Sequence, residues 1–502
     1  MTSHGAAWRP FLLAVTFTCA CLNMLASGSL YVYTLYAPFF TGRLGYSQTQ
    51  TSLIAVIGDL GLYGAGPVNG FLADHFGPRA TSLYAAFLIA SGYSLLSFTY
   101  ANGVTRVDQG LPPPSFLLMS FSFLLAGVGS SASYMAAFTS LAKNFKQGRG
   151  LALGIPISFF GLSAAVLTLI AQTFFMVNVD QLVGEERREL DAKGFLLFLG
   201  IFGGCANLFS VIGLKILPSP EVSPEGRVES NHAHAASPPR VQDEQTPLLR
   251  DDVAGTPAQG RHTRTPPSVS GKAFFMDTNA QFFFLVTLCL AGTGLMIINS
   301  ISAIVDAVAA AKSLFLPVGL VASLGGPNPV SSTRAIHVAL ISVSSYTGRV
   351  LSGLGSDVAI HRYGAYRTDV LPIASICMAL AQLVGMFAPL RWLYLCSILT
   401  GLAYGGFFGI SGTIVAELWG EDTCGQNWGW LSWGAGFGGF LFNLLFGVVM
   451  DASRPVVDGE PQTCKGNHCF RWALVVSFIA CLLSCYVSLL MGRRQRRAAA
   501  LT

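Results

Sequence analysis

Long runs of apolar residues, separated by short polar stretches, repeat along the whole 502-residue chain. A helix needs about 20 mostly apolar residues to cross the hydrocarbon core of a bilayer. Six runs of that kind precede residue 218 and six follow residue 275. The predicted spans are about 11–39, 50–72, 80–100, 115–141, 151–177, 194–217, 278–308, 335–356, 369–389, 392–417, 427–450 and 471–491. The pattern predicts an all-α membrane protein with twelve transmembrane helices.

The stretch between the two sets of spans has a different character. Residues 218–275 are rich in Pro, Ser, Glu, Arg and His and show no apolar periodicity, which is typical of a disordered, solvated linker. We therefore expect a six-helix bundle at 1–217, the linker at 218–275, a second six-helix bundle at 276–492 and a basic tail at 493–502. Six plus six helices form an internal repeat at the level of topology.

Composition excludes a large soluble enzyme. Apolar residues make up 52% of the chain and charged residues 11%, whereas a soluble domain carries about 25% charge. The first apolar run could instead be a cleaved signal peptide, with Ala26-Ser27-Gly28 as the cleavage site. The run is longer than a signal-peptide core and further spans follow it, so an uncleaved first helix is favoured.

Basic residues predict the orientation of the spans. Lys143, Lys146 and Arg149 lie in one loop, and the C-terminal tail is rich in arginine at 493–497. Placing both termini in the cytosol puts more than half of the 30 Lys and Arg residues on that side, in agreement with the positive-inside rule. The net charge of +5 then follows from topology, and no nucleic-acid partner is expected.

Two short loops repeat one pattern, in which a Gly is followed four residues later by an Asp at the end of a span. A carboxylate there is stabilised if it meets the N-terminus of another helix, where free N–H groups and the helix dipole favour negative charge. Such a contact can form in one conformation and break in another, which would make it a gate; the alternative is a plain turn. The gating candidates are Gly70, Asp74, Gly77 and Arg79 in the first loop and Gly353 and Asp357 in the second.

Polar side chains three or four residues apart mark one face of the first, fourth, seventh and tenth spans. Polar groups in a membrane must find partners, so such faces turn to the bundle interior or to a water-filled cavity. These side chains either line a substrate cavity or form hydrogen bonds between helices. The substrate-cavity candidates are Asn23, Ser27, Tyr31, Ser130, Tyr134, Asn299, Ser302, Tyr404 and Ser411.

Three charged residues fall inside predicted spans, where they are costly and indicate function. Arg349 could bind a substrate carboxylate with its fork of donors, or pair structurally at the cytosolic gate, because Asp357 follows eight residues later. Asp59 lies deep in the second span and could take up a proton, or be held by neighbouring hydroxyl groups. Asp306 lies near the outer end of its span, where water can reach it.

Cysteines give one further signal outside the spans. Cys464 and Cys469 flank a loop predicted on the lumenal or outer side, where a disulfide can form. A metal site that also uses His468 is the alternative, although two thiols and one imidazole within six residues are not a usual zinc spacing. A metal is therefore not expected.

The linker carries an acidic residue, three spacers and a Leu-Leu pair, at Glu244, Leu248 and Leu249. This pattern resembles the dileucine sorting signal that adaptor complexes read on the way to lysosomes and vacuoles. The sequence contains neither a His-Glu-x-x-His pair nor a nucleotide-binding Gly loop. An intramembrane enzyme, an ATP-driven pump and a cofactor are therefore not expected.

Several of these stretches together resemble the major facilitator superfamily. The matching residues are 70–79 and 353–357, which resemble two copies of its loop motif, and 148–150, 348–349, 417–420 and 427–429. The resemblance implies two pseudo-symmetric six-helix bundles that alternate access to a site between helices 1, 4, 7 and 10. It also implies that Asp74 docks near 426–429, and Asp357 near 148–150, when the cytosolic side is closed.

More narrowly, Arg9-Pro10-Phe11, Gly28-Ser29-Leu30-Tyr31 and Tyr36-Ala37-Pro38 look like fungal homologues of monocarboxylate transporters, in particular the vacuolar branch. Animal monocarboxylate transporters carry an acidic residue before a glycine in helix 1, and Ala26-Ser27-Gly28 has none. The resemblance implies a multi-pass protein of the vacuolar membrane, with the plasma membrane less favoured.

We therefore expect a secondary active transporter of a small organic solute. Its expected partners are the lipid bilayer and the solute, with protons as a candidate coupling ion and an adaptor complex as a candidate partner of the linker. The alternative function is a transporter-like nutrient sensor or scaffold without net flux.

Overall fold

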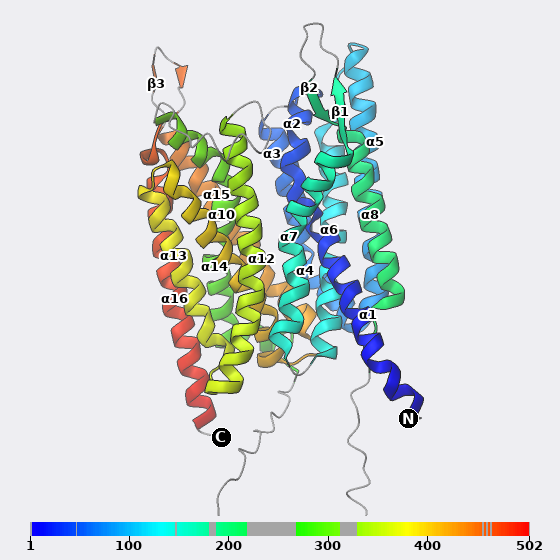
Figure 1. The fold of residues 1–502 in the computed structure, drawn as a ribbon, viewed down its shortest axis with the longest axis vertical. Helices are drawn as coiled ribbons and strands as arrows, with labels where there is room; N and C mark the ends of the chain where they lie inside the picture. The colour runs from blue at the N-terminus through cyan, green and yellow to red at the C-terminus, as the bar shows by residue number, and fades with distance from the viewer. Residues whose placement is uncertain are drawn as a thin grey trace, which may run out of the picture.

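The structure is a computed structural model, which describes residues 3–46, 48–145, 148–179, 187–217, 268–311, 329–453, 456–457, 460–461 and 464–500. The sorting candidates Glu244, Leu248 and Leu249 lie outside the described residues. Figure 1 shows two helical bundles side by side, with the N-terminal bundle on the right and the C-terminal bundle on the left. Both chain ends lie at the bottom of this view, and we call that end the terminal face.

The N-terminal bundle holds the first six predicted spans. The first is bent by a 3₁₀ turn (Gly28–Val32) and the second is interrupted by a π turn (Leu60–Gly64). Its elements are α1 (Ser3–Ser27), α2 (Tyr33–Gly42), α3 (Gln48–Asp59), α4 (Gly66–His75), α5 (Gly77–Asp108), α6 (Phe116–Asn144), α7 (Arg149–Phe174), the antiparallel hairpin β1 (Met176–Val179) and β2 (Arg187–Leu190), and α8 (Ala192–Gly213).

The C-terminal bundle holds the other six predicted spans. A short helix precedes it, and a small hairpin and two 3₁₀ turns join its helices. Its elements are α9 (Lys272–Met276), α10 (Thr278–Ala311), α12 (Pro329–Tyr363), the turn Arg367–Val370, α13 (Leu371–Phe387), α14 (Leu390–Trp419), α15 (Cys424–Ala452), β3 (Val456–Val457), β4 (Glu460–Pro461), the turn Asn467–Cys469 and α16 (Arg471–Ala500).

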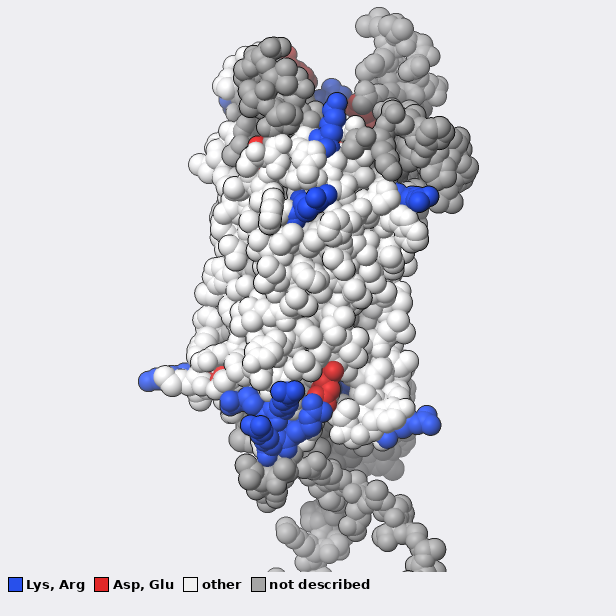
Figure 2. All heavy atoms as spheres, turned by 90° about the vertical axis from the view of Figure 1, so that its left-hand side faces the viewer, with Lys and Arg blue, Asp and Glu red and all other residues white. Residues whose placement is uncertain are grey.

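The expectation of an all-α membrane protein is confirmed. Ten of the described helices are long and apolar enough to cross a membrane. The other two predicted spans are the interrupted segment 48–75 and α12, which carries charged residues along its length. Figure 2 shows the matching surface: a broad band without charge, with lysines and arginines gathered towards its two ends. Such a band suits the hydrocarbon core of a bilayer.

The turn between α4 and α5 explains part of the first loop motif. Gly77 has a φ of 84°, in the left-handed region that favours glycine. Pro78 fits the first turn of α5, where an N–H would have no helical partner. Arg79 Nε donates a hydrogen bond to the carbonyl of Leu214, just after α8, at 3.3 Å. The loop thus ties three helices of one bundle together.

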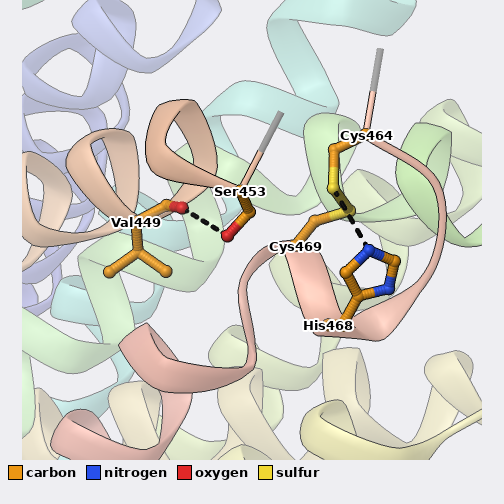
Figure 3. The surroundings of a disulfide bond; sticks show 5 residues. All are labelled: Val449, Ser453, Cys464, His468 and Cys469. Atoms are coloured by element: carbon orange, nitrogen blue, oxygen red, sulfur yellow. Dashed lines mark hydrogen bonds between the residues drawn. A yellow bond between two sulfur atoms is a disulfide. The ribbon is translucent and has the colours of Figure 1, made fainter. Parts of the chain in front are cut away.

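Two features at the ends of the molecule refine the predictions. The arginines at 493–497 do not form a separate tail, because α16 continues as a helix to Ala500. Cys464 and Cys469 form a disulfide in the segment between β4 and α16 (Figure 3). Both sulfurs are used in that bond, so neither is a thiolate ligand for the alternative metal site with His468.

Glycines bring the two bundles into backbone contact along two seams in the terminal half of the membrane region. On the α4–α15 seam, a Cβ added to Gly70 would lie 2.0 Å from the carbonyl oxygen of Gly425. On the α7–α12 seam, a Cβ added to Gly353 would lie 2.5 Å from the carbonyl oxygen of Gly150. Side chains larger than hydrogen at these positions would push the bundles apart.

Aromatic side chains of both bundles fill the space between the seams. One buried cluster joins Phe138 and Phe160 of the N-terminal bundle to Phe408 and Trp428 of the C-terminal bundle. The Trp428 ring centroid lies 6.2 Å from that of Phe138 and 6.1 Å from that of Phe408. Two further clusters each belong to one bundle alone. The bundles therefore share a core in the terminal half, which closes the terminal face.

The Gly353→Ala variant is expected to open the terminal face, because overpacking costs about 1–3 kcal/mol. This cost would lower the ratio of closed to open molecules by about 5- to 150-fold. Cys424 is fully buried at the start of α15, so its alkylation reports opening. The measurement is its reaction rate with a maleimide after replacement of the other eight of the nine free cysteines.

Gly355→Ala is the matched control for this test. It lies two residues further along the same helix, and a Cβ there meets nothing within 4 Å. We expect Gly355→Ala to leave the Cys424 rate unchanged. Equal rates in the two variants would contradict a close-packed seam at Gly353.

Candidate functional site

Asp74, at the end of α4, reaches across the first seam. Its Oδ2 accepts a hydrogen bond from the N–H of Gln426, in the first turn of α15, at 2.8 Å. Its side chain is 1% exposed, and Lys143 Nζ lies 3.5 Å from Oδ1. The carboxylate thus meets a helix N-terminus, where N–H groups without helical partners favour negative charge. We call this contact the first latch.

Asp357 of α12 makes the mirror contact across the second seam. Its Oδ1 and Oδ2 accept hydrogen bonds from the N–H groups of Gly150 and Leu151, in the first turn of α7, at 3.1 and 2.9 Å. Arg367 donates to the same carboxylate at 2.5 Å. We call this contact the second latch. Both latches lie at the positions that the loop-motif resemblance implies.

Ion pairs brace both latches. Arg149, the first residue of α7, lies 2.7 Å from Glu421 in the loop between α14 and α15, so this pair also joins the two bundles. Arg367 lies 2.7 Å from Glu417 within the C-terminal bundle. A carboxylate that holds charged and main-chain donors together forms stronger hydrogen bonds than a neutral group would.

A small cavity of about 40 Å³ lies between the bundles, further into the membrane region than the latches. A water needs about 10–15 Å³ of such space, so the cavity holds a few waters and must widen for an organic solute. Its walls are mostly apolar and aromatic. The lining residues are Leu62, Tyr63, Ser131, Tyr134, Met135, Ile157, Phe160, Arg349, Tyr404, Phe408, Trp428 and Ser432.

Arg349 carries the charge in this lining. The residue is 2% exposed, and its Nη1 donates to Ser345 Oγ at 2.6 Å. Its guanidinium carbon lies 6.0 Å and 5.9 Å from the ring centroids of Tyr404 and Phe408. Among the described residues, no carboxylate lies within ion-pair distance of Arg349. The gate pairing considered from the sequence is not formed, because Arg367 occupies the place beside Asp357.

Three polar groups at the cavity have no hydrogen-bond partner among the described residues. They are the Nε of Arg349 and the hydroxyl groups of Ser131 and Tyr134, all buried. Gly161 leaves room for the guanidinium, because a Cβ there would lie 1.9 Å from Arg349 Nη1. A buried cation without a counter-charge is unfavourable, so the site is suited to an anion.

Tyrosine hydroxyl groups connect the two bundles beside the cavity. The hydroxyl groups of Tyr31 and Tyr63 lie 2.9 Å apart, and the Tyr31 ring packs edge-on against Phe160 at 5.3 Å. Tyr404, from the C-terminal bundle, interacts with both. Asp59, the last residue of α3, lies near these tyrosines. It directly precedes the π turn, a feature that often marks functional sites.

The predicted cavity residues divide into two sets. Tyr134 and Tyr404 line the cavity, and Tyr31 bonds to the lining residue Tyr63. The remaining N-terminal candidates make contacts inside their own bundle. Asn23 donates to Ser82 at 3.1 Å, and Ser27 donates to the carbonyl of Ser130 at 2.6 Å. These hydrogen bonds hold helices together, as the alternative interpretation of the polar stripes predicts.

The remaining C-terminal candidates also lie outside the lining. Ser411 donates to a carbonyl of its own helix, Asn299 is exposed and Ser302 is half-buried. Asp306 pairs with Arg334 at 2.6 Å, and both side chains are about two-fifths exposed. Asp306 thus lies in a solvated ion pair and not in the cavity.

The second, fifth, eighth and eleventh spans contribute more to the cavity than sequence reasoning expected. Among the described residues, neither α1 nor α10 supplies a lining side chain. Tyr63 and Trp428 line the cavity but were not among the sequence-based candidates. The sequence contains a signal for each: Tyr63 follows Asp59 by one helical turn, and Trp428 lies within 427–429, one of the stretches that resemble the major facilitator superfamily.

Comparisons with known proteins agree with this architecture. A family profile described as Nodulin-like matches residues 14–221. The probable transporter mch1 of Neurospora crassa is 24% identical over 538 residues, which cover 93% of this chain and 87% of that protein. The probable transporter MCH1 of Candida albicans is 26% identical and covers 94% and 92%. The chain is therefore similar to these fungal proteins over nearly its whole length.

Solved structures decide the fold. A bacterial homologue of the iron transporter ferroportin, in the outward-facing state, superimposes with a TM-score of 0.60 at 11% identity and covers 95% of this chain and 98% of its own. FucP, a Major Facilitator Superfamily transporter in the outward conformation, gives 0.54 at 13% identity and covers 94% and 98%. The chain has the major facilitator fold. Relatives and structural neighbours are described as transporters and not as enzymes, as expected.

The hydrogen bond between Asp74 and the N-terminus of α15 leads to a testable prediction about the first latch. Asp74→Asn should weaken the closure of the terminal face by about tenfold or more, because hydrogen bonds to a charged group contribute about 1.5–3 kcal/mol. Spin labels at Phe76 and Asp422, both exposed positions, would measure the separation of the two bundles at that face.

Asp357→Asn should have a similar effect at the second latch. Because the two latches lie on different seams, we expect their effects on the closed population to multiply in the double variant. Unchanged distance distributions in both single variants would show that the carboxylates do not hold the bundles closed.

Proposed function

We propose that the protein is a secondary active transporter of a small organic anion, working by alternating access. The observation that carries this proposal is the buried guanidinium of Arg349, which faces a cavity between two bundles and has no carboxylate partner among the described residues. The fungal relatives' description as probable transporters supports the transport class.

The latches supply the proposed switch. When both carboxylates sit on the N-termini of α15 and α7, the seams are closed and solute reaches the site from the face opposite the termini. Movement of the bundles apart at the terminal face would break both contacts together. Each state then needs its own set of contacts, and solute binding biases the balance between them.

Arg349 sets the proposed substrate class. Its unpaired Nε and the unpaired hydroxyl of Ser131 can donate hydrogen bonds to a carboxylate. The rings of Tyr404, Phe408 and Trp428 can pack against the apolar part of a small organic anion. A solute held by Arg349 of the C-terminal bundle and Ser131 of the N-terminal bundle would touch both halves. Binding can therefore be coupled to their movement.

Protons are the proposed coupling ion, with Asp59 as the group that carries them. Asp59 lies at the break between α3 and the π turn and interacts with the tyrosines that surround the cavity. Protonation would remove a negative charge close to the anion site. While Asp59 is ionised it repels a bound anion, so binding of the anion favours protonation of Asp59 and the two are taken up together.

The proposed location is the vacuolar membrane, with both termini in the cytosol and the dileucine residues of the linker presented to an adaptor complex. This rests on the likeness to the vacuolar branch of the fungal homologues and on the placement of basic residues. Under this orientation the terminal face, which is closed in the structure, is the cytosolic face.

The alternative function is a sensor or scaffold, which would bind the anion without net flux.

Arg349→Gln is expected to reduce uptake of small carboxylates into proteoliposomes at least about 100-fold, because loss of a buried charge-assisted pair costs about 3–5 kcal/mol. Arg349→Lys keeps the charge but loses the planar fork, so we expect partial activity. Arg334→Gln, on the same helix but in the solvated pair with Asp306, is the control with near-normal uptake. Normal uptake by Arg349→Gln would rule out this site, and binding without uptake in the unmodified protein would favour the sensor.

Asp59→Asn is expected to abolish the dependence of uptake on an imposed pH gradient, since the amide cannot exchange a proton. Exchange of labelled for unlabelled solute should persist, because the anion site itself is unchanged. The measurement compares vesicles with and without the gradient. Retention of gradient-driven accumulation in Asp59→Asn would exclude Asp59 as the coupling group.

A further inference from the structure

The last residues of the linker that the structure describes are bound to the C-terminal bundle at the terminal face. The N–H of Val269 donates to the carbonyl of Trp419 at 3.0 Å. The carbonyl of Val269 accepts from Asn427 Nδ2 at 2.8 Å and from Thr423 Oγ1 at 3.2 Å. The Ser268 hydroxyl lies 3.1 Å from Thr423 Oγ1. We call residues 268–270 the strap.

The surface that binds the strap provides both space and hydrogen-bond partners for it. Gly420 has a φ of 86°, and a Cβ there would lie 2.9 Å from the Cα of Ser268, so a side chain at this position would displace the strap. Asn427 is fully buried, and its amide group has Val269 and Thr423 as partners. Removal of the strap would take the carbonyl of Val269 from this buried amide and leave Thr423 as its remaining partner.

The strap holds the element that forms the first latch. Thr423 precedes the first residue of α15, and Asn427 directly follows Gln426, whose N–H donates to Asp74. Three strap hydrogen bonds therefore fix the same helical turn that presents a donor to the latch carboxylate. A change at Ser268 or Val269 that releases the strap would loosen this turn.

We infer that the strap stabilises the first latch, and that a negative charge on the exposed Ser268 hydroxyl opens the latch. This inference rests on the latch role proposed above. The added charge would lie beside a loop that already carries Glu421 and Asp422. It would also compete with Asp74 for the N-terminal donors of α15.

Phosphorylation is the chemistry that would supply this charge. The Ser268 oxygen would attack the terminal phosphorus of a nucleoside triphosphate, forming the Ser–O–P bond while the bond to the departing nucleoside diphosphate breaks. The hydroxyl proton would pass to a base on the kinase. The phosphoserine would then lose its donor to Thr423 and gain a charge of about −2.

The experiment measures alkylation of Cys424 in the full chain, with the other free cysteines replaced. Ser268→Glu should raise the rate at least about threefold, because both repulsion and competition act on the latch. Ser270→Glu is the matched control, since this exposed residue adds the same charge two positions along. We expect it, and Ser268→Ala, to change the rate less than about 1.5-fold.

An unchanged rate in Ser268→Glu would overturn the inference, and so would an equal increase in Ser270→Glu, which would indicate a general effect of charge. Because the measurement records opening and not uptake, either result leaves the anion-transport proposal standing. Conversely, loss of that proposal through normal uptake by Arg349→Gln would not alter the Cys424 rates.

Discussion

A buried positive charge without a counter-charge is the constraint on which this structure depends. Arg349 lies between the two bundles, 2% exposed, where an unpaired ion is strongly unfavourable. Ser345 and two aromatic rings stabilise it in part, and Gly161 gives it room. These contacts leave Nε without an acceptor. This arrangement is expected of a site in which a solute that binds and dissociates supplies the missing acceptor.

The closed terminal face depends on a different balance. Glycine pairs let the bundles meet backbone to backbone along two seams, and a carboxylate sits on a helix N-terminus at the end of each seam. The contacts run in opposite directions, because Asp74 reaches from the N-terminal bundle and Asp357 from the C-terminal bundle. Both seams are therefore held at the terminal face by the same kind of hydrogen bond, and the two sets of bonds can be broken together.

Much of the fold could be predicted because its signals are local. Apolar runs predict spans whatever their neighbours are, and the Gly-to-Asp spacing at 70–74 and 353–357 marks both loop motifs. The hydrogen-bond partners of Asp74 and Asp357 also lie where the family resemblance puts them. Of the two alternatives for Arg349, the pairing with Asp357 is not formed, because eight residues of helix separate the two by about 12 Å and Arg367 occupies the place beside Asp357.

The cavity lining could not be predicted in the same way, because periodicity identifies a face but not what that face meets. Asn23 and Ser27 share a face that packs on α5 and α6, so their polarity serves helix packing. Tyr63 and Trp428 line the cavity only because the π turn Leu60–Gly64 packs against α15. The strap is also beyond local patterns, since Val269 and Asn427 are 158 residues apart.

The central claim is that the guanidinium of Arg349 binds an anionic solute. The most direct test compares the transport of a carboxylate with that of its uncharged amide analogue. Uptake of radiolabelled small carboxylates by the unmodified protein in proteoliposomes would be measured beside uptake of the corresponding primary amides, which match them in shape. The account predicts transport of one or more carboxylates, with the matching amide at least about 100-fold slower. Equal transport of an acid and its amide would contradict it.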